Sequence, residues 1–445
     1  MKHIHFIGIG GIGTSALAKY YLAKDYKISG CDLSASEITD QLKSDVELKI
    51  GKSKKSCINS SVDLLVYTTA ATSDHPDLVS ARELNIPNST YAEALGELTK
   101  DHYTIAVSGT HGKSTTTSML GILLMKAGLD PTVIVGTKVK EFGNSNCRIG
   151  KGKYLVIEAD EYAASFLNYH PNIIVLTSLE ADHLDYYKTF SKLFDTFKRY
   201  LENLESGGYI VANSDDKNIA KLVQGKSNVH KYSLKQKEAI ELRETMKIPG
   251  EHNIANALAA FTASGILKVS KERALSSLSK YKGSWRRFEI FKMDKPCPYT
   301  LVSDYGHHPT EIAATIQGAR AKWPNKDIWL IYQPHQYHRT YVLFDDFVKT
   351  LSKLPINRLV LADIYDVAGR EDKEILKQVS SKRLAQEVAK EKVHPETILH
   401  ITPQKKIADY LKKELKGGEI VLIMGAGTIY NLTIELTKKS KRGRI

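Results

Sequence analysis

The stretch Ser108-Gly109-Thr110-His111-Gly112-Lys113-Ser114-Thr115 decides how the middle of this 445-residue chain is built. It follows an apolar, strand-like run at 103–107 and opens a helical pattern that is clearest at 119–127. A strand, a tight glycine-containing turn and a helix start aim backbone N–H groups at one point, which favours a polyphosphate. The Lys113 ammonium can neutralise β- and γ-phosphates, and the Ser114 hydroxyl can reach a magnesium ion. The sequence therefore predicts a nucleoside triphosphate site.

This loop departs from the usual P-loop pattern at one position. The pattern has a glycine five residues before the Gly-Lys pair, but Val107 stands there in this chain. We therefore expect a shortened variant in which Gly109 and Gly112 form the turn. The alternative is an ordinary loop of glycine, serine and threonine without a ligand.

The composition is that of a globular protein, because 42% of the residues are hydrophobic and 25% are charged. The length favours roughly two to four domains. No apolar run approaches the ~20 residues of a membrane span, and the N-terminus resembles a first strand rather than a signal peptide. Four widely spaced cysteines, with neither metal nor disulfide spacing, fit a reducing cytoplasm: Cys31, Cys57, Cys147 and Cys297.

The net charge of +13 raises the question of nucleic-acid binding. The lysines are scattered, however, and the only concentrated basic block is the tail at 438–444. No basic stripe interleaved with aromatic residues is present, as single-stranded nucleic acid would require. We therefore interpret the charge as a solvated surface, which can also attract anionic small substrates, and expect no nucleic-acid partner.

The first 99 residues alternate between strand-like and helical patterns, which is the rhythm of a parallel sheet. Gly8-Ile9-Gly10-Gly11-Ile12-Gly13 follows the first strand and fits G-x-G-x-x-G, and Asp32 follows the second strand. On its own this fingerprint favours a dinucleotide such as NAD or FAD, with Asp32 near a ribose. The predicted elements are strands at 4–7, 26–30 and 63–68 and a helix at 13–23.

In the second segment, strand-like runs at 154–157 and 173–176 each end in acidic residues. Ligands of open α/β sheets sit at the carboxyl ends of strands, so these residues are expected to face the phosphate loop. Magnesium keeps few protein ligands and prefers oxygen, which suits such a cluster. Glu158 and His183 are the favoured residues, whereas Asp160 and Glu161 are equally compatible with helix capping.

The third segment follows Arg286-Arg287-Phe288-Glu289 and repeats the α/β pattern. Each predicted strand again ends in a polar or glycine-rich sequence, such as Asp304-Tyr305-Gly306-His307-His308 or Gly425-Ala426-Gly427. The chain is therefore predicted to contain three α/β units, divided at 1–99, 100–285 and 286–445. The predicted strands of the last unit are 299–302, 327–332, 358–362 and 419–424.

Taken together, the motifs resemble those of the Mur ligase family, nearly from end to end of the chain. Seven ordered motifs are far more specific than any one of them. Besides the two glycine-rich loops, they comprise Glu158-Ala159-Asp160-Glu161, Glu180-Ala181-Asp182-His183-Leu184-Asp185, His252-Asn253-Ile254-Ala255-Asn256-Ala257-Leu258, Arg286-Arg287-Phe288-Glu289 and Asp304-Tyr305-Gly306-His307-His308-Pro309-Thr310-Glu311.

The resemblance implies a Rossmann-like N-terminal domain, a central P-loop-type ATPase domain and a Rossmann-like C-terminal domain. It also changes the ligand expected at the first loop, because that domain holds the UDP part of a sugar nucleotide in this family. The implied reaction joins L-alanine to the carboxylate of UDP-N-acetylmuramate in cytoplasmic peptidoglycan synthesis. ATP activates the carboxylate as an acyl phosphate, and Mg²⁺ assists. The chain is expected to act as a monomer or homodimer, without inserting into a membrane.

The resemblance also implies roles for individual residues. Lys113, His183, Arg287 and Asp304 would be catalytic. ATP would be bound by Gly109, Thr110, His111, Gly112, Lys113, Ser114, Thr115, Asn253 and Asn256, and magnesium by Ser114, Glu158 and His183. The UDP-sugar would be bound by Gly8, Gly10, Gly11, Gly13 and Asp32, and the amino acid by His307, His335 and Arg339.

Three departures from the family pattern matter for these expectations. Ser178 replaces a frequent asparagine, and Tyr162-Ala163 replaces Ser-Asp. Gln336 stands where the family has an arginine that would grip a carboxylate. The second arginine of that stretch is retained as Arg339, and Arg370 could compensate for the lost one. Lys198 lies near a lysine that is carbamylated in some relatives, but we interpret it as a surface residue.

Two other functions remain as alternatives. The first is a recycling ligase that adds a ready-made tripeptide to the same sugar nucleotide, which Tyr162 slightly favours. The second is a nicotinamide-dependent dehydrogenase, suggested by the first loop with Asp32. The dehydrogenase leaves the second phosphate loop, Glu158 and His183 without a role.

Overall fold

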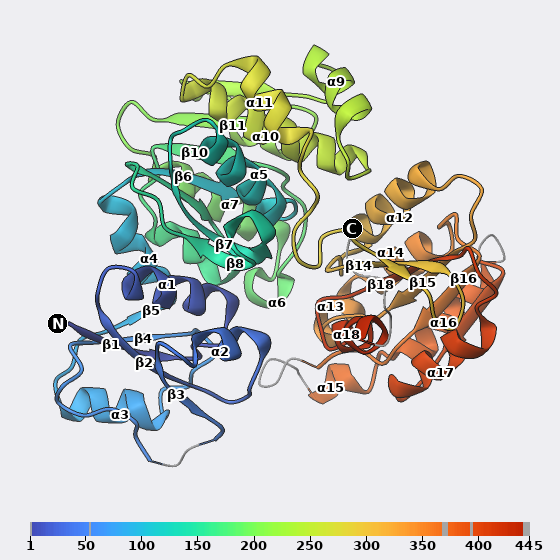
Figure 1. Ribbon diagram of the computed structural model, residues 1–445, viewed down its shortest axis with the longest axis horizontal. Helices are drawn as coiled ribbons and strands as arrows, with labels where there is room; N and C mark the ends of the chain where they lie inside the picture. Colours follow the sequence, from blue (N-terminus) through green and yellow to red (C-terminus); the bar gives the residue numbers. More distant parts are fainter. Residues whose placement is uncertain (1, 53–54, 367–372, 392–394, 439–445) are drawn as a thin grey trace. The chain divides into compact units, whose positions relative to one another are not determined.

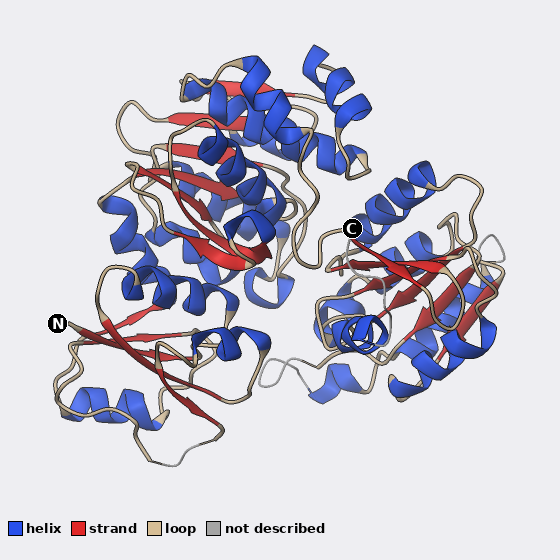
Figure 2. Ribbon diagram, in the orientation of Figure 1, coloured by secondary structure: helices blue, strands red, loops and turns tan. Residues whose placement is uncertain are grey.

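The computed structural model describes residues 2–52, 55–366, 373–391 and 395–438. These residues form three β-sheets packed against helices (Figures 1 and 2). Two compact units can be distinguished, and each is described separately. The first comprises Met1–Asp182, Thr189–Thr245 and Ala255–Tyr281, and the second comprises His183–Lys188, Met246–Ile254 and Lys282–Ile445.

The first sheet has the strand order β3-β2-β1-β4-β5, and all its strands are parallel. Its central strand β1 is buried along its whole length, as expected for a parallel strand covered on both faces. The predicted strands are confirmed, whereas β3 and β5 escaped prediction because they are short and polar. The elements are β1 (His3–Ile7), α1 (Ile12–Leu22), β2 (Lys27–Asp32), α2 (Glu37–Leu42), β3 (Glu47–Ile50), β4 (Leu64–Tyr67), α3 (Pro76–Glu83), β5 (Asn88–Thr90) and α4 (Tyr91–Lys100).

The second sheet has the order β12-β11-β10-β6-β9-β7-β8, and only β8 runs antiparallel to its neighbour. Its elements are β6 (Tyr103–Ser108), α5 (Lys113–Lys126), β7 (Thr132–Val139), η1 (Lys140–Phe142), β8 (Ser145–Arg148), β9 (Tyr154–Glu158), η2 (Tyr162–Asn168), β10 (Ile173–Leu176), α7 (Phe190–Leu201), β11 (Tyr209–Asn213), α8 (Lys217–Leu222), β12 (Val229–Tyr232), α9 (Lys237–Thr245), α10 (Glu251–Ile266) and α11 (Lys271–Leu278).

The register of this sheet brings three strand ends together. Strand β6 lies between β9 and β10, with Val107 opposite Glu158 and Ser108 opposite Leu176. The phosphate loop and the first acidic cluster therefore leave the same edge of the sheet, as the sequence predicted. Helix α5 begins at Lys113, six residues before the clear helical pattern, because the run Ser114–Ser118 has low helix propensity and little apolar character.

The third sheet has the order β13-β14-β18-β15-β16-β17, with β13 antiparallel at one edge. Helices α12, α14 and α16 pack on one face, and α17 and α18 pack on the other. The elements of the second unit are α6 (Leu184–Tyr187), β13 (Glu289–Met293), β14 (Tyr299–Asp304), α12 (Pro309–Lys322), β15 (Ile328–Tyr332), α13 (Tyr337–Val342), α14 (Phe344–Leu351), β16 (Arg358–Leu361), α15 (Lys373–Leu376), α16 (Ser381–Lys390), β17 (Thr397–His400), α17 (Lys405–Glu414), β18 (Ile420–Met424) and α18 (Tyr430–Lys438).

The third sheet also gathers its functional loops at one edge. Asp304 and Tyr332 both lie opposite Met424, the last residue of β18. The loops that follow β14, β15 and β18 therefore start side by side. The predicted strand positions are confirmed here, whereas the division of the chain at residues 99 and 285 stays a prediction.

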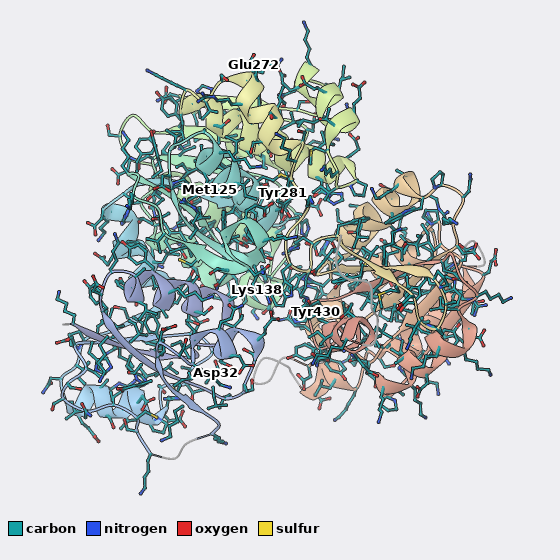
Figure 3. The ribbon with its side chains drawn as sticks, in the orientation of Figure 1. Asp32, Met125, Lys138, Glu272, Tyr281 and Tyr430 are labelled. Atoms are coloured by element: carbon teal, nitrogen blue, oxygen red, sulfur yellow. The ribbon has the colours of Figure 1, made fainter. Side chains whose placement is uncertain are left out.

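Polar contacts join the first two sheets within the first unit. Lys19 Nζ lies 2.9 Å from Asn146 Oδ1, and Asn146 Nδ2 donates to Ser15 Oγ at 2.8 Å. The ammonium of Lys138, labelled in Figure 3, pairs with Glu37 at 2.5 Å. These contacts fix the helices α1 and α2 against the β7–β8 hairpin. Among the described residues, no helix has the length and apolar character needed to cross a bilayer.

Candidate functional site

Two positions of the phosphate loop between β6 and α5 require glycine. Gly109 and Gly112 have φ values of 137° and 81°, in the region that side chains disfavour. A Cβ atom on Gly109 would lie 2.2 Å from the Thr177 hydroxyl, and one on Gly112 would lie 2.3 Å from Asn256 Oδ1. The two glycines therefore form the turn, as the sequence predicted.

Ser178, at the end of β10, fixes the backbone of this loop. Its carbonyl accepts from Thr110 N at 3.0 Å, and its hydroxyl accepts from His111 N at 2.8 Å. Thr110 Oγ1 in turn accepts from Glu180 N at 3.1 Å. The serine that replaces the frequent asparagine thus supports the loop directly. The next amides, from Lys113 to the buried Thr115, begin a helix and have no intrahelical acceptors.

Lys113 is held by a carboxylate that is fully buried. Its ammonium lies 3.0 and 2.8 Å from the two oxygens of Glu161 and donates to Gly109 O at 2.7 Å. Asp160 lies farther away at 3.8 Å and is exposed. Burial disfavours the charged amine, but the Glu161 and Asp160 carboxylates outweigh it and raise the pKa of Lys113. Lys113 therefore stays a cation at the centre of the loop.

This geometry shows which groups two residues of the acidic cluster contact. Glu161 is a counter-ion for Lys113 in the first unit. Asp160 accepts from Tyr162 N at 3.2 Å, just before η2. The sequence could not single out Glu161, because nothing in its spacing indicates that it reaches back to the phosphate loop.

Ser114 and Glu158 form a second pair of groups beside Lys113. Ser114 Oγ donates to Glu158 Oε1 at 2.9 Å, and Glu158 Oε2 accepts from Gly136 N at 2.7 Å. A Cβ on Gly136 would lie 2.7 Å from the same carboxylate oxygen. A hydroxyl and an oriented carboxylate at a phosphate loop are the oxygen donors that Mg²⁺ prefers. The residues present therefore fit a magnesium ion.

Three other predicted residues have contacts within their own units. His111 Nε2 lies 3.6 Å from Glu180 Oε2 in the first unit. Asn253 and Asn256 lie on α10, as predicted, and Asn253 Nδ2 donates to Pro249 O at 2.6 Å. The Asn256 side chain lies against Gly112 of the loop itself. Asn253 belongs to the second unit and Asn256 to the first.

His183 belongs to the second unit. It has the left-handed φ of 52° immediately before α6. Such a conformation is uncommon outside glycine and asparagine and is often found where function requires it. Helix α6 packs against α13 in the same unit.

The first glycine-rich loop is held by its own backbone and by Asp32. The amides of Gly8 and Ile9 donate to Cys31 O at 2.8 and 3.2 Å, and Gly11 N donates to Gly8 O at 3.0 Å. Gly10 N donates to Asp32 Oδ2 at 2.9 Å, and a Cβ on Gly10 would lie 2.8 Å from that oxygen. Asp32 is labelled in Figure 3. A Cβ on Gly13 would lie 2.8 Å from the Tyr91 ring, so close packing also requires this glycine.

In the second unit, Asp304 shapes the loop that carries Arg287. Its two oxygens accept from Phe288 N and Gly306 N, both at 2.8 Å. Burial raises the pKa of Asp304, whereas Arg287 and these two amides oppose the increase. The guanidinium of Arg287 lies over the Tyr305 ring, 4.8 Å from its centroid.

Arg286 is a residue that sequence reasoning missed. It is buried, and its guanidinium donates to Gly425 O and stands 4.8 Å from the centroids of both Tyr305 and Tyr430. It thereby joins the loop at 286–289 to the loop after β18. Both Arg286 and Arg287 belong to the family motif, but the resemblance implied a role only for Arg287; the fold shows what Arg286 contacts.

His307, His335 and Arg339 lie together, as predicted for an amino-acid site. The ring centroids of His307 and His335 are 5.6 Å apart, and Arg339 Nη1 lies 3.3 Å from His335 Nδ1. Glu311 accepts from His307 N at 2.9 Å. Tyr365 stacks on the His335 ring at 5.4 Å. The cluster combines aromatic rings with a buried guanidinium.

Three further residues that were compared with the family pattern differ in their surroundings. Gln336 is buried and has a left-handed φ of 69°. Its backbone N–H donates to Tyr365 O at 3.0 Å. Lys198 is exposed on α7 and pairs with Asp195 at 3.3 Å, as expected for a surface lysine. Arg370 lies outside the described residues.

Comparison with known proteins agrees with this architecture. Three family models match along the chain: "Mur ligase family, catalytic domain" at 3–103, "Mur ligase middle domain" at 107–264 and "Mur ligase, glutamate ligase domain" at 286–427. The chain is also 38% identical to the UDP-N-acetylmuramate–L-alanine ligase of Clostridium acetobutylicum, over 97% of this chain and 96% of that protein. This chain belongs to the Mur ligase family.

Other Mur ligases give the same result. The UDP-N-acetylmuramate–L-alanine ligase of Acetivibrio thermocellus is 36% identical over 97% of this chain and 94% of its own. The UDP-N-acetylmuramate–alanine ligase structure from Thermotoga maritima has a TM-score of 0.81 at 24% identity and covers 99% of both chains. A murein peptide ligase from Psychrobacter arcticus has a TM-score of 0.70 at 21% identity, over 98% of both chains.

At such identities the two structures establish only the fold, which is the three-domain Mur ligase architecture. Membership of the Mur ligase family implies that the chain uses ATP. The phosphate loop with its buried lysine is the feature that fits this use.

Proposed function

We propose that this chain joins L-alanine to the carboxylate of UDP-N-acetylmuramate, with ATP converted to ADP and phosphate. The reaction would belong to the cytoplasmic synthesis of peptidoglycan precursors. The observation that carries the proposal is the phosphate loop with Lys113 and the Ser114–Glu158 pair. It occurs in a chain that matches alanine-adding Mur ligases over 97% of its length.

The chemistry requires this loop because a carboxylate is a poor acceptor for an amine. Transfer of the γ-phosphoryl group to the carboxylate gives an acyl phosphate, which has a good leaving group. Transfer brings two anions together, so a cation at the γ-phosphoryl oxygens lowers the barrier. Lys113 supplies that charge when its ammonium leaves the Glu161 carboxylate and binds the phosphates instead.

Ser114, Glu158 and His183 would hold Mg²⁺. When bound, the ion neutralises phosphate charge and orients the oxygens for transfer. The loop amides from Gly109 to Thr115 would cradle the β-phosphate, and His111 would support them through Glu180. Asn256, which touches Gly112, and Asn253 would approach the nucleotide from α10.

The first sheet would bind the UDP part of the sugar nucleotide. Gly8, Gly10, Gly11 and Gly13 let the backbone approach a diphosphate closely, and α1 begins behind them. The loop contains no cationic side chain. It is therefore suited to hold a diphosphate without reacting with it. Asp32 would orient the loop and meet the ribose or the uracil.

The second unit would bind the amino acid. Arg339, buried beside His335, would bind the carboxylate of L-alanine, and His307 would lie near the incoming amine. The neutral amine attacks the acyl carbon, a tetrahedral intermediate forms, and phosphate leaves. Arg287 and Asp304 would shape the loop that closes the site. Water must be excluded, because it would hydrolyse the acyl phosphate.

The test is phosphate release from ATP in the presence of UDP-N-acetylmuramate. L-Alanine, glycine, L-serine and the tripeptide of the recycling reaction are compared as acceptors. We expect turnover with L-alanine to exceed that with the tripeptide by at least about tenfold. A preference for the tripeptide would assign the chain to the recycling reaction. The absence of UDP-sugar-dependent phosphate release with every acceptor would overturn the proposal.

A further inference from the structure

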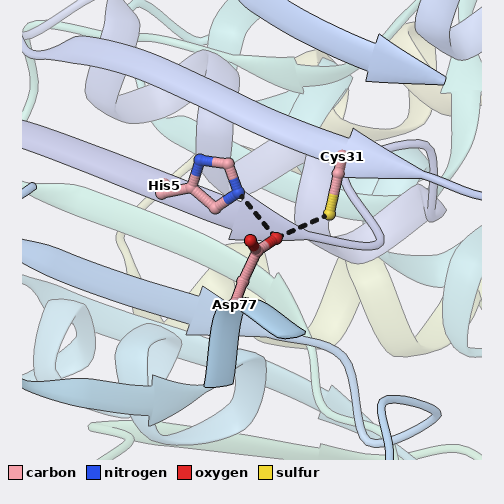
Figure 4. Close-up of side chains that lie close together, drawn as sticks. All are labelled: His5, Cys31 and Asp77. Atoms are coloured by element: carbon pink, nitrogen blue, oxygen red, sulfur yellow. Dashed lines mark hydrogen bonds and ion pairs between the residues drawn. The ribbon is translucent and has the colours of Figure 1, made fainter. Parts of the chain in front are cut away.

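A separate cluster of chemically reactive side chains lies inside the first sheet. His5 on β1, Cys31 on β2 and Asp77 in the first turn of α3 point toward one another (Figure 4). Their exposed fractions are 2%, 8% and 1%, so all three are buried. The positions are far apart in the sequence, which is why cysteine spacing gave no sign of a metal site.

The two distances from Asp77 in this cluster match the edges of a tetrahedral metal centre. Asp77 Oδ2 lies 3.4 Å from His5 Nε2 and 3.3 Å from Cys31 Sγ. All three ligand atoms lie within 4.8 Å of one another. With Zn–N and Zn–O bonds near 2.0 Å and a Zn–S bond near 2.3 Å, tetrahedral edges are about 3.3 to 3.6 Å. Asp77 therefore already stands at the separation from His5 and from Cys31 that a bound ion requires.

The surrounding hydrogen bonds orient the ligand atoms inward. His5 Nδ1 lies 2.8 Å from Ser29 Oγ, which leaves Nε2 directed at the cluster. Among the described residues, the only polar contact recorded for this buried Nε2 is the long one to Asp77 Oδ2. Asp77 Oδ1 accepts from Cys57 N at 2.5 Å and from Ser56 Oγ at 3.0 Å, so Oδ2 faces the other two groups. Such outer partners are typical of metal ligands.

From these contacts we propose that His5 Nε2, Cys31 Sγ and Asp77 Oδ2 bind a divalent transition-metal ion of the zinc type. A neutral imidazole, a carboxylate and a thiolate carry two negative charges together, which a divalent cation cancels. This balance matters because an uncompensated charge in a buried site is costly. A thiolate and an imidazole favour zinc over magnesium or calcium.

Binding exchanges a proton for the metal. The S–H bond of Cys31 breaks, the sulfur–metal bond forms, and the proton leaves to solvent. Burial and the neighbouring Asp77 raise the pKa of Cys31, so the thiol is protonated before the ion binds. Burial opposes ionisation of Asp77, but hydrogen bonds from His5 and from Cys57 N lower its pKa overall.

The site adjoins the first glycine-rich loop without being part of it. Cys31 O accepts from Gly8 N and Ile9 N, and the next residue, Asp32, accepts from Gly10 N. A metal on the Cys31 side chain would fix this end of β2 beneath the loop. The proposal does not depend on the reaction of the chain, and its test does not use activity.

The test uses cobalt(II) as a spectroscopic probe of the full-length protein, freed of metal and kept reduced. Wild type should bind one equivalent at this site and show a thiolate-to-cobalt charge-transfer band. The band should be lost in Cys31→Ser and kept in Cys147→Ser, a matched control because Cys147 is also buried. No band in wild type, or an equal band in Cys31→Ser, would overturn the proposal.

A measurement on wild type covers the case in which Cys31→Ser fails to fold. X-ray absorption at the zinc edge, with one equivalent of Zn²⁺ added, should show one sulfur neighbour at about 2.3 Å and nitrogen or oxygen neighbours at about 2.0 Å. Thermal unfolding should shift upward with Zn²⁺ and not with Mg²⁺ at the same concentration. A shell without sulfur would contradict the assignment of Cys31.

Discussion

The two glycine-rich loops of the first unit share a strand–loop–helix design and differ in how their charges are used. In the first loop the carboxylate of Asp32 accepts a hydrogen bond from Gly10 N within the loop. In the second loop the carboxylate of Glu161 holds the Lys113 ammonium. The charge of the first loop is a carboxylate bound to the loop backbone, whereas the second loop has a cation paired with a carboxylate.

The difference fits the two kinds of phosphate chemistry that we propose for the two loops. A loop that only binds a diphosphate needs directed amides and a helix N-terminus. A loop that transfers a phosphoryl group also needs a charge that follows the moving oxygens. The glycine pattern therefore indicates phosphate binding, and the side chains beside it distinguish binding from transfer.

The largest effect on turnover is expected at Lys113, the cation of the second loop. Lys113→Ala should lower turnover at least about 100-fold, because a charge contact to the transition state is lost. Phosphate release at saturating ATP, UDP-N-acetylmuramate and L-alanine measures the change. Lys126→Ala is the matched control, since Lys126 is exposed at the other end of α5.

Breaking a buried ion pair also costs stability, by roughly 3–5 kcal/mol in typical cases. The kinetic result for Lys113→Ala is therefore checked in the double variant with Glu161→Gln, which leaves no unpaired charge. Folding is monitored by circular dichroism. Near-normal turnover of either folded variant would remove Lys113 from the mechanism.

A second, smaller effect distinguishes the role of the phosphate loop from the role of the amino-acid site. Without L-alanine, ATP and UDP-N-acetylmuramate should form an acyl phosphate that hydroxylamine traps as a hydroxamate. Arg339→Ala should still give this product but make the alanyl amide about 10- to 100-fold more slowly, as expected for a lost charge-assisted hydrogen bond. Trapping should be lost in Lys113→Ala, Glu158→Gln and His183→Ala. Release of AMP and pyrophosphate would contradict the mechanism.

A third change tests the exchange of partners at Lys113. Glu161→Gln removes the carboxylate that keeps the buried amine charged, so burial should then lower the pKa of Lys113 from its present raised value. Wild type should keep activity as the pH rises toward the ordinary lysine value of 10.5, whereas Glu161→Gln should lose it earlier. The pH profile of turnover between 8 and 10 is the measurement.

Binding of ATP should also stabilise Glu161→Gln more than wild type, because the triphosphate supplies the missing negative charge. Thermal unfolding with and without ATP shows this difference. Asp160→Asn is the matched control, since Asp160 is exposed and lies 3.8 Å from the ammonium. Equal responses in all three proteins would mean that Glu161 does not act as an exchangeable partner.

Much of the fold followed from the sequence because the central strands are continuous apolar runs. β1, β6 and β10 were predicted from such runs and are buried throughout or nearly so. The edge strands β3 and β12 were missed, because exposed edges tolerate polar residues. Helix α5 was placed too late, since tertiary burial overrides the low propensity of its first turns.

The candidate site was predictable where a motif lies within one loop. Gly109, Gly112 and the Ser114–Glu158 pair follow from local pattern and from the alignment of strand ends. The partnership of Lys113 with Glu161 and the burial of Arg286 could not be predicted in this way. Both depend on the path of the chain after a strand, which sequence spacing does not reveal.

The smallest effect on ligand binding is expected at Asp32, whose carboxylate is bound to the first loop. In Asp32→Asn the amide oxygen can still accept from Gly10 N, so the loop should keep its shape and lose only the charge-assisted part of one hydrogen bond. This part is worth about 1 kcal/mol, which corresponds to roughly fivefold weaker binding of UDP-N-acetylmuramate. Calorimetry should detect that change and show no binding of NAD to either protein. If Asp32 instead held the ribose of a nicotinamide dinucleotide, wild type would bind NAD and Asp32→Asn would lose it. The two loops would then differ in their ligand rather than in the use of their charges.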